Sequence, residues 1–229
     1  MPSNLVILIF QFLVLIFSIM IHEVAHGVAA LKLGDHTAER AGRLTLNPLK
    51  HIDPFGSIFL PLLLSIPALF GQPTAIIGWA KPVPYDPRHL KNPERAAGLI
   101  ALAGPATNIL VAFIIGTLIR FTIAFVNPQI IILFSVIVSL NLVLAIFNLL
   151  PIPPLDGSKV INLLLTQGGQ LRLQKLFFTL HAWIRMYWFA FVIAFVLFFQ
   201  EIMTVLFLVI RPVVNILHWL FTGFPSPFL

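Results

Sequence analysis

The sequence predicts an all-α membrane protein, a polytopic bundle of about four to six transmembrane helices. Hydrophobic residues make up 59% of the 229-residue chain and charged residues only 10%, whereas a soluble domain carries roughly a quarter charged residues. Four apolar stretches also approach or exceed the roughly 20 residues that a helix needs to cross a bilayer. They cover residues 4–21, 98–119, 129–150 and 188–210.

Glycine and proline set the expected helix boundaries, because both residue types are common where helices begin or end. Gly34 follows the first helix, and Pro151 ends the third. We predict spanning helices at about residues 4–33, 93–120, 129–150 and 186–210, with amphipathic interfacial helices within residues 157–185.

Two shorter elements are expected between the first two spans. Leu44 and Leu46 alternate with polar neighbours before Asn47-Pro48, which is typical of a short strand and predicts a β-hairpin-like segment at residues 42–48. The apolar run 55–70 contains Pro61 and Pro67. We predict that this run enters the bilayer and returns as a re-entrant segment.

Composition limits the function and the kind of site. The chain has no cysteine, so a metal would have to be held by His, Asp or Glu. A net charge of +6 could suggest nucleic acid, but the basic residues lie in short loops between apolar helices, where they report orientation in the membrane. We expect no nucleic-acid partner and no removable signal peptide. Residues 1–229 are predicted to form one membrane-embedded domain, with a catalytic core at about 4–160 and an interfacial and a transmembrane helix at 160–229.

The first helix carries the pattern H-E-x-x-H at His22-Glu23-Val24-Ala25-His26. Residues four apart lie on one face of a helix, so two imidazoles can bind one zinc ion there. Glu23 is then placed to act as a general base. Ionisable residues within a membrane helix are costly unless they are paired or functional, which favours a metal site over a cluster that only packs helices together.

Two histidines leave a catalytic zinc site one protein ligand short. Asp156 is the candidate, because it follows Pro151, Pro153 and Pro154 at the end of the third helix. Broken backbone at membrane depth is tolerated only where protein buries it or a watery cavity meets it. The alternative is an ordinary solvated Asp-Gly turn at residues 156–157.

Three ordered motifs resemble the site-2 protease family of intramembrane metalloproteases, and small bacterial members above all. The motifs are His22–His26, Gly104–Asn108 and Asn148–Gly157, and the resemblance covers about residues 10–160. It implies one Zn²⁺ ion bound by His22, His26 and Asp156, with Glu23 as the catalytic base. It also implies hydrolysis of transmembrane protein or peptide substrates, as in regulated intramembrane proteolysis. The chain has no room for the PDZ insertion or CBS domain of larger members.

The resemblance also points to Asn108 and Asn148 as active-site residues. The Asn148 amide is expected to donate to the developing oxyanion or to fix the peptide. Asn108 is expected to do the same, or only to bridge helices by hydrogen bonding.

A shared metal constrains the topology. His22 and His26 lie near the C-terminal end of the first helix, and Asp156 follows the third, so these ends must lie on one side of the membrane. Most of the 14 Lys and Arg residues fall on that side. The positive-inside rule then places the zinc site toward the cytoplasm, in what we expect to be a bacterial inner membrane.

Two other functions fit part of the pattern. A divalent-metal transporter could use the same His and Asp residues, but it would need more acidic or His residues along a path, and the second and third helices offer almost none. A non-proteolytic scaffold would have no need of Glu23. The sequence leaves the oligomeric state and the identity of the substrate open.

Overall fold

A computed structural model describes residues 4–59, 80–167 and 199–226, with isolated positions between 62 and 66 and between 179 and 190. Four helices in this part of the chain are long and apolar enough to cross a membrane. They are α1 (Asn4–Lys32), α4 (Pro93–Thr122), α5 (Pro128–Asn148) and α9 (Phe199–Thr222). The predicted helical bundle is confirmed, with these four candidate spans among the described residues.

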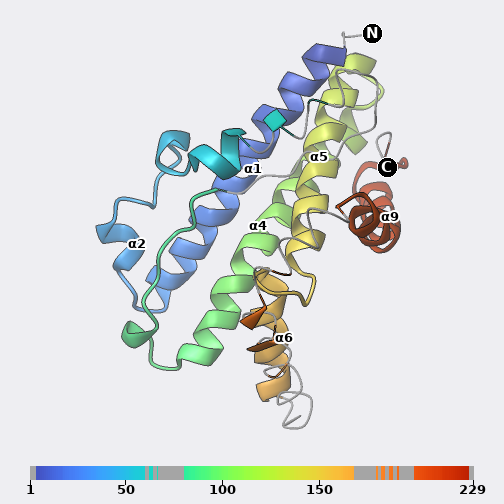
Figure 1. Ribbon diagram of the computed structural model, residues 1–229. Helices are drawn as coiled ribbons and strands as arrows, with labels where there is room; N and C mark the ends of the chain where they lie inside the picture. Colours follow the sequence, from blue (N-terminus) through green and yellow to red (C-terminus); the bar gives the residue numbers. More distant parts are fainter. Residues whose placement is uncertain are drawn as a thin grey trace.

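Helices α1, α4 and α5 lie side by side and alternate in direction (Figure 1). The C-terminal end of α1, the start of α4 and the end of α5 therefore lie at one end of the bundle. Helix α6 (Asp156–Gln167) packs on α4 at that end, and α9 packs on α4 and α5.

Local sequence explains where the helices start. The Asn92 side chain accepts a hydrogen bond from the Arg95 amide before α4, and Asn127 accepts one from the Gln129 amide before α5. A proline follows each cap, at a position where its missing N–H costs nothing. Helix α1 is followed by Gly34, whose φ of 102° suits glycine.

Glycines on α4 set how closely its neighbours approach, as is common where membrane helices pack. A Cβ atom at Gly98 would lie 2.5 Å from Leu163 of α6, and one at Gly116 would lie 2.7 Å from Phe221 of α9. At Gly104 the neighbours are the rings of His22 and His26 on α1. Helix α4 is thus the central support of the bundle.

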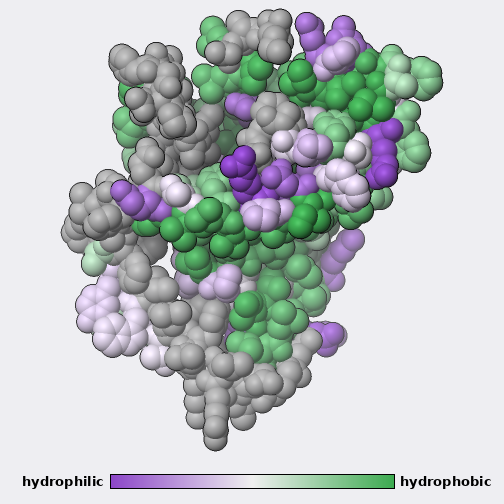
Figure 2. Space-filling view, turned by 90° about the vertical axis from the view of Figure 1, so that its right-hand side faces the viewer, coloured by the Kyte–Doolittle hydropathy of each residue, from purple (hydrophilic) through white to green (hydrophobic). Residues whose placement is uncertain are grey.

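The main apolar core joins α4, α5 and α9 away from the histidines. Its fully buried members are Ala112, Ile119, Val138, Leu142, Ile210 and Val214. Outside this core, Figure 2 shows wide apolar areas on one face of the molecule, and the exposed large hydrophobic residues include Phe113 on α4 and Leu208 on α9. Such an apolar exterior is suited to lipid rather than to water.

Short elements connect α1 to α4. They are α2 (Thr37–Arg40), the 3₁₀ turns η1 (Pro48–Lys50) and η3 (Pro87–His89), and the π-helical turn η2 (Pro54–Phe59). The predicted β-hairpin is wrong, since no described residue lies in a strand. The alternating pattern has another cause. Leu44 packs over Gly27 of α1, while the Arg43 guanidinium donates to the Lys81 carbonyl.

Two further expectations meet the limits of the described chain. Of the predicted re-entrant run 55–70, η2 describes the first part, and the rest lies almost wholly outside the described residues. The last span was expected to end near residue 210, but α9 continues to Thr222 with Pro212 inside it. Ile210 and Val214 flank this proline and are fully buried in the core, so packing holds the helix together where its sequence suggests an end.

Candidate metal centre

Helix α1 presents His22 and His26 on one face, as their spacing requires. Their ring centroids are 4.6 Å apart. Helix α6 begins at Asp156. The Asp156 Oδ2 atom lies 3.1 Å from Nε2 of His22 and 3.1 Å from Nε2 of His26. The structure therefore brings together the three side chains that the sequence suggested as ligands, although Asp156 lies 130 or more positions from the two histidines in the chain.

These three atoms fit a zinc ion in both chemistry and spacing. Zinc binds imidazole nitrogen and carboxylate oxygen at about 2.0–2.2 Å in tetrahedral geometry. Two such ligand atoms then lie roughly 3.3 Å from each other, and the observed separations from Asp156 Oδ2 are close to that value. Two His and one carboxylate also leave a fourth position open, which a catalytic zinc site needs.

Hydrogen bonds fix both imidazoles with Nε2 toward the site. The Nδ1–H of His22 donates to Asn108 Oδ1 at 2.7 Å, and that of His26 donates to the Ile100 carbonyl at 2.7 Å. Both acceptors are oxygens without a proton to give, so each Nδ1 carries the hydrogen and each Nε2 keeps its lone pair.

A proline-rich turn delivers Asp156 to α1. Gly157 follows it at a place where a Cβ atom would collide with the Leu149 carbonyl, so the turn closes more tightly than any other residue would permit. The Asp156 carboxylate thus lies against the Nε2 atoms of both imidazoles, and a carboxyl group binds a metal in its ionised form.

Asn108, which the sequence analysis proposed as an active-site or bridging residue, touches a histidine. It is 1% exposed, and its Nδ2 donates to Asn141 Oδ1 at 2.9 Å. Asn141 in turn donates to the Ser18 hydroxyl of α1 at 3.0 Å. Sequence reasoning missed Asn141 and Ser18. An asparagine in an apolar spanning helix is costly when unpaired, and that signal could have identified Asn141.

Asn148 lies at the end of α5 and is half-buried. Its Nδ2 donates to the Leu144 carbonyl of its own helix at 2.9 Å. One amide N–H therefore remains available in Asn148 beyond this bond.

Glu23 faces a proline-rich segment that precedes α4. The Val83 amide donates to Glu23 Oε2 at 2.9 Å, and one ligand atom each from His22, Glu23 and His26 fall within 4.8 Å of one another. We call residues 80–86 the strap, because they lie along α1. The local pattern of prolines gave no sign that this segment reaches Glu23.

Comparisons with known proteins agree with the geometry. The model of peptidase family M50 matches residues 123–195. The chain is 40% identical over 168 residues to the protein named putative zinc metalloprotease YwhC of Bacillus subtilis, covering 70% of this chain and 71% of that protein. It is 38% identical to putative zinc metalloprotease Rip2 of Mycolicibacterium smegmatis over 62% of this chain and 52% of that protein. No solved structure matches the chain.

Proposed function

The chain belongs to peptidase family M50, the site-2 proteases, and is an integral-membrane zinc metalloprotease; we propose that it cleaves transmembrane proteins or peptides within or beside the bilayer. The observation that carries this proposal is the meeting of Asp156 with His22 and His26, because these two histidines lie on a helix whose length and apolar composition suit a membrane span. A soluble substrate would not need its protease to hold the reacting groups on such a helix.

We assign one zinc ion to Nε2 of His22, Nε2 of His26 and Oδ2 of Asp156. Such an ion, when bound, polarises the scissile carbonyl and makes water a nucleophile near neutral pH. The chain itself fixes the ligands. Asn108 and the Ile100 carbonyl hold the two rings in one tautomer, and Gly104 leaves room for both rings.

Glu23 acts as the general base. It accepts a proton from the attacking water and delivers it to the leaving amine, so that the C–N bond breaks as the new C–O bond is retained and charge is conserved. The Val83 amide holds Oε2 and leaves Oε1 for proton transfer. Asn148 has a second amide N–H, which we assign to the oxygen of the scissile carbonyl.

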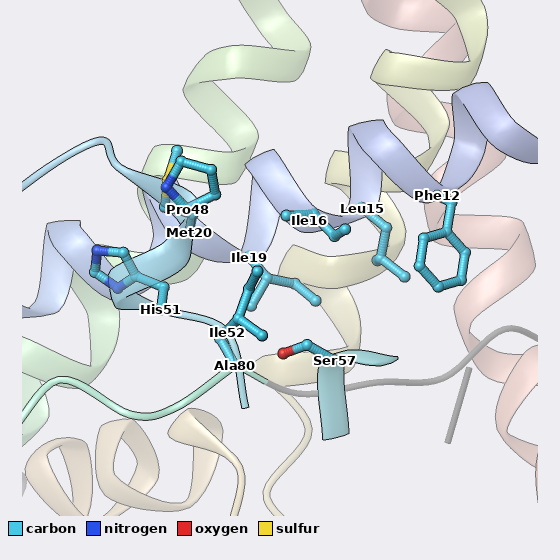
Figure 3. A pocket seen from close by; sticks show the side chains of 10 residues that line it. All are labelled: Phe12, Leu15, Ile16, Ile19, Met20, Pro48, His51, Ile52, Ser57 and Ala80. Atoms are coloured by element: carbon cyan, nitrogen blue, oxygen red, sulfur yellow. The ribbon is translucent and has the colours of Figure 1, made fainter. Parts of the chain in front are cut away.

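An apolar pocket lies beside this base and supports a transmembrane substrate. The pocket is lined by Phe12, Leu15, Ile16, Ile19, Met20, Pro48, His51, Ile52, Ser57 and Ala80 (Figure 3). Ile16 and Ile19 precede Glu23 by seven and four positions, so they share its face of α1. We propose that an apolar substrate side chain next to the scissile bond enters this pocket.

Basic residues favour a cytoplasmic position for the site. The connection from α1 to α4, with the helix turns on either side of it, carries Lys32, Arg40, Arg43, Lys50, Lys81, Arg88, Lys91 and Arg95. The positive-inside rule places such loops in the cytoplasm. We propose an inner-membrane protein whose single catalytic domain takes part in regulated intramembrane proteolysis.

Incubation of the purified protein with a panel of single-span membrane peptides tests the proposal, with mass spectrometry to locate the cut. We expect cleavage within or beside the apolar segment, loss of cleavage with a chelator, and recovery on adding Zn²⁺. Glu23→Gln should lower the rate about 10²- to 10⁴-fold and leave the zinc content unchanged. A Glu23→Gln variant that cleaves as fast as the wild type would remove Glu23 from the reaction.

The same experiment separates the other functions. A metal transporter would move Zn²⁺ into vesicles and cleave nothing. A scaffold would bind the peptides without cutting them. Cleavage confined to soluble peptides would contradict the assignment of a membrane substrate while leaving the protease activity intact.

A further inference from the structure

The strap follows α1 from Glu23 toward the end of that helix. Near its start the Lys81 amide donates to the His51 carbonyl at 2.9 Å. The Val83 amide then donates to Glu23. The Val83 side chain packs against Gly27, so closely that a Cβ atom added to Gly27 would lie 2.8 Å from Val83 Cγ1. Glu23 and Gly27 are one helical turn apart, so Val83 lies against one face of α1 and contacts both positions.

Prolines make the register of the strap decisive. Val83 stands between Pro82 and Pro84, and proline has no backbone N–H. Between Lys81 and Tyr85, only Val83 can therefore donate a backbone hydrogen bond. A slip of one residue in either direction would place a proline opposite Glu23, and the carboxylate would lose its donor.

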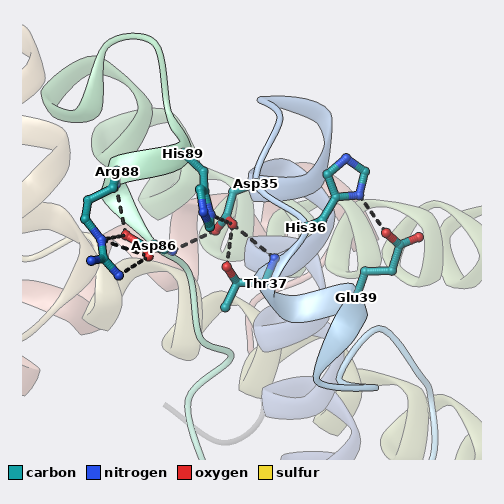
Figure 4. Close-up of polar contacts among 7 residues, drawn as sticks. All are labelled: Asp35, His36, Thr37, Glu39, Asp86, Arg88 and His89. Carbon is teal, nitrogen blue, oxygen red and sulfur yellow. Dashed lines mark hydrogen bonds and ion pairs between the residues drawn. The ribbon is translucent and has the colours of Figure 1, made fainter.

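Asp35 ties the far end of the strap to the end of α1 (Figure 4). Its side chain is fully buried, at 0% exposed. Oδ2 accepts the Asp86 amide at 2.7 Å, and Oδ1 accepts Nδ1–H of His89 at 3.1 Å. The Asp35 amide in turn donates to the Ala30 carbonyl at 3.0 Å, which fixes Asp35 itself to α1.

The charge on Asp35 is permanent at neutral pH. Burial opposes ionisation, but hydrogen bonds from the Thr37 hydroxyl, the Asp86 amide, His89 and the Thr37 amide outweigh it and hold the pKa of Asp35 at about 2. The neighbouring Asp86 carboxylate is engaged by Arg88, with Arg88 Nη2 2.7 Å from Asp86 Oδ2, so it does not compete for the donors around Asp35.

The bonds to Thr37 alone could be explained as a local turn before α2. The bonds to Asp86 and His89 could not, because these residues lie 51 and 54 positions away in the chain. Asp86 follows Val83 by three residues, which spans at most roughly 10 Å. Fixing Asp86 on the end of α1 therefore fixes which strap residue lies opposite Glu23.

We propose that Asp35 is a positioning residue of the protease: it sets the register of the strap on α1, so that the one available amide, that of Val83, holds the general base Glu23. The proposal rests on the function proposed for Glu23. Asp35 touches neither metal ligands nor Glu23, and it acts only through the strap.

A double-mutant cycle tests this role. Asp35→Asn keeps the volume but replaces an acceptor oxygen by a donor amide. We expect it to lower kcat about 10- to 100-fold, with KM changed less than about twofold and the zinc content unchanged. Val83→Pro removes the donor directly and should lower kcat to a similar extent. If Asp35 acts through Val83, the double variant is no slower than Val83→Pro alone. Effects that multiply, or an Asp35→Asn variant with wild-type kcat, overturn the proposal.

The control variant is Glu39→Gln. Glu39 pairs with His36 at 2.7 Å in the same connection after α1, but both residues are exposed and neither contacts the strap (Figure 4). We expect wild-type kcat, KM and zinc content for it. A loss of kcat equal to that of Asp35→Asn would show that any disturbance of this connection has the same effect, and would overturn the specific role of Asp35.

Hydrogen exchange gives a readout that needs neither activity nor a folded Val83→Pro variant. Residues 82–84 contain a single backbone N–H, that of Val83, so a peptide resolved to this segment reports on the bond to Glu23 alone. Asp35→Asn should speed exchange at Val83 and Asp86 and leave α5 unchanged. Unchanged exchange at Val83 overturns the proposal. If Asp35→Asn exchanges faster at Val83 but the wild-type protein cleaves no peptide at all, the proposed function is contradicted and the anchoring role of Asp35 still stands.

Discussion

The two ends of the bundle are held together in different ways. At the end that carries the proposed metal site, α1, α4, α5 and α6 meet through buried polar groups, and His22 is linked to Ser18 through Asn108 and Asn141. At the other end, α4, α5 and α9 meet through a core of fully buried aliphatic residues. The comparison teaches that the apolar end sets which helices are neighbours, whereas the polar end sets the orientation of particular atoms.

This difference follows from the physics of the two contacts. Apolar packing is not directional, so an aliphatic core tolerates small shifts. A buried hydrogen bond is directional, and losing one partner leaves the other unsatisfied at a cost of roughly 1–3 kcal/mol. A change at the metal end should therefore reduce function more than stability, and a change at the apolar end should do the opposite.

The largest contrast is expected between two glycines of the same helix. Gly104→Ala would place a methyl group 2.6 Å from the rings of both His22 and His26, so we expect cleavage to fall at least about 100-fold with loss of bound zinc. Gly116→Ala would press instead on Phe221 of α9, 2.7 Å away, and should lower the unfolding temperature while zinc stays bound. Metal analysis and thermal unfolding of both variants measure the contrast. Equal zinc contents would contradict it.

A smaller effect is expected from the partner of His22. Asn108→Ala removes the acceptor for His22 Nδ1–H, and loss of such a partner typically weakens metal binding about 10- to 100-fold. Competition with a zinc chelator measures the affinity. Ser139→Ala is the matched control, because Ser139 is also a buried polar residue of a spanning helix and its hydroxyl bonds that of Ser226 at 2.9 Å. An Asn108→Ala variant with wild-type affinity would show that the ring needs no such support.

A substitution in the apolar pocket should change the preference between substrates roughly 10-fold, as expected for one or two methylene groups in such a pocket. Ile19→Phe narrows the pocket, so cleavage should shift toward peptides with a smaller side chain next to the scissile bond. Phe17→Trp is the control on the same helix, because Phe17 is 47% exposed and does not line the pocket. Unaltered preference in Ile19→Phe would remove the pocket from substrate recognition.

The smallest expected effect is the pH dependence of the stability that Asp35 contributes. The pKa of Asp35 is lowered from 3.8 to about 2 in the folded protein, so its bonds contribute stability that is complete above about pH 4 and is lost as the pH falls through about 2. At pH 5 we expect Asp35→Asn to unfold about 2–4 °C below the wild type, and the gap should close by pH 2. Asp86 has a pKa of about 2 as well, but it is present in both proteins and cancels in the difference. A gap that persists at pH 2 would assign the stability to something other than the Asp35 charge.

Much of the bundle was predictable from the sequence, because lipid imposes strong rules on it. The expected bounds of the first three long helices lie within a few residues of α1, α4 and α5. The pairing of Asp156 with the two histidines was also predictable. Two histidines leave a zinc site one ligand short, and Asp156 follows a proline-broken turn that needs burial or a watery cavity. The β-hairpin was predicted wrongly because alternation at residues 42–48 reflects separate contacts of Arg43 and Leu44 with two different segments.

The sequence alone determined the class of protein and the imidazole and carboxyl atoms that α1 carries. Membrane spans follow from apolar length, and a helix with His22 and His26 four residues apart must present two imidazoles on one face. Only the tertiary structure decided what holds those atoms: the partnership of Asn108 with His22, the amide of Val83 on Glu23, and the anchoring of the strap by Asp35. Each of these contacts joins residues more than 50 positions apart, and local patterns carry no information about the packing that brings such residues together.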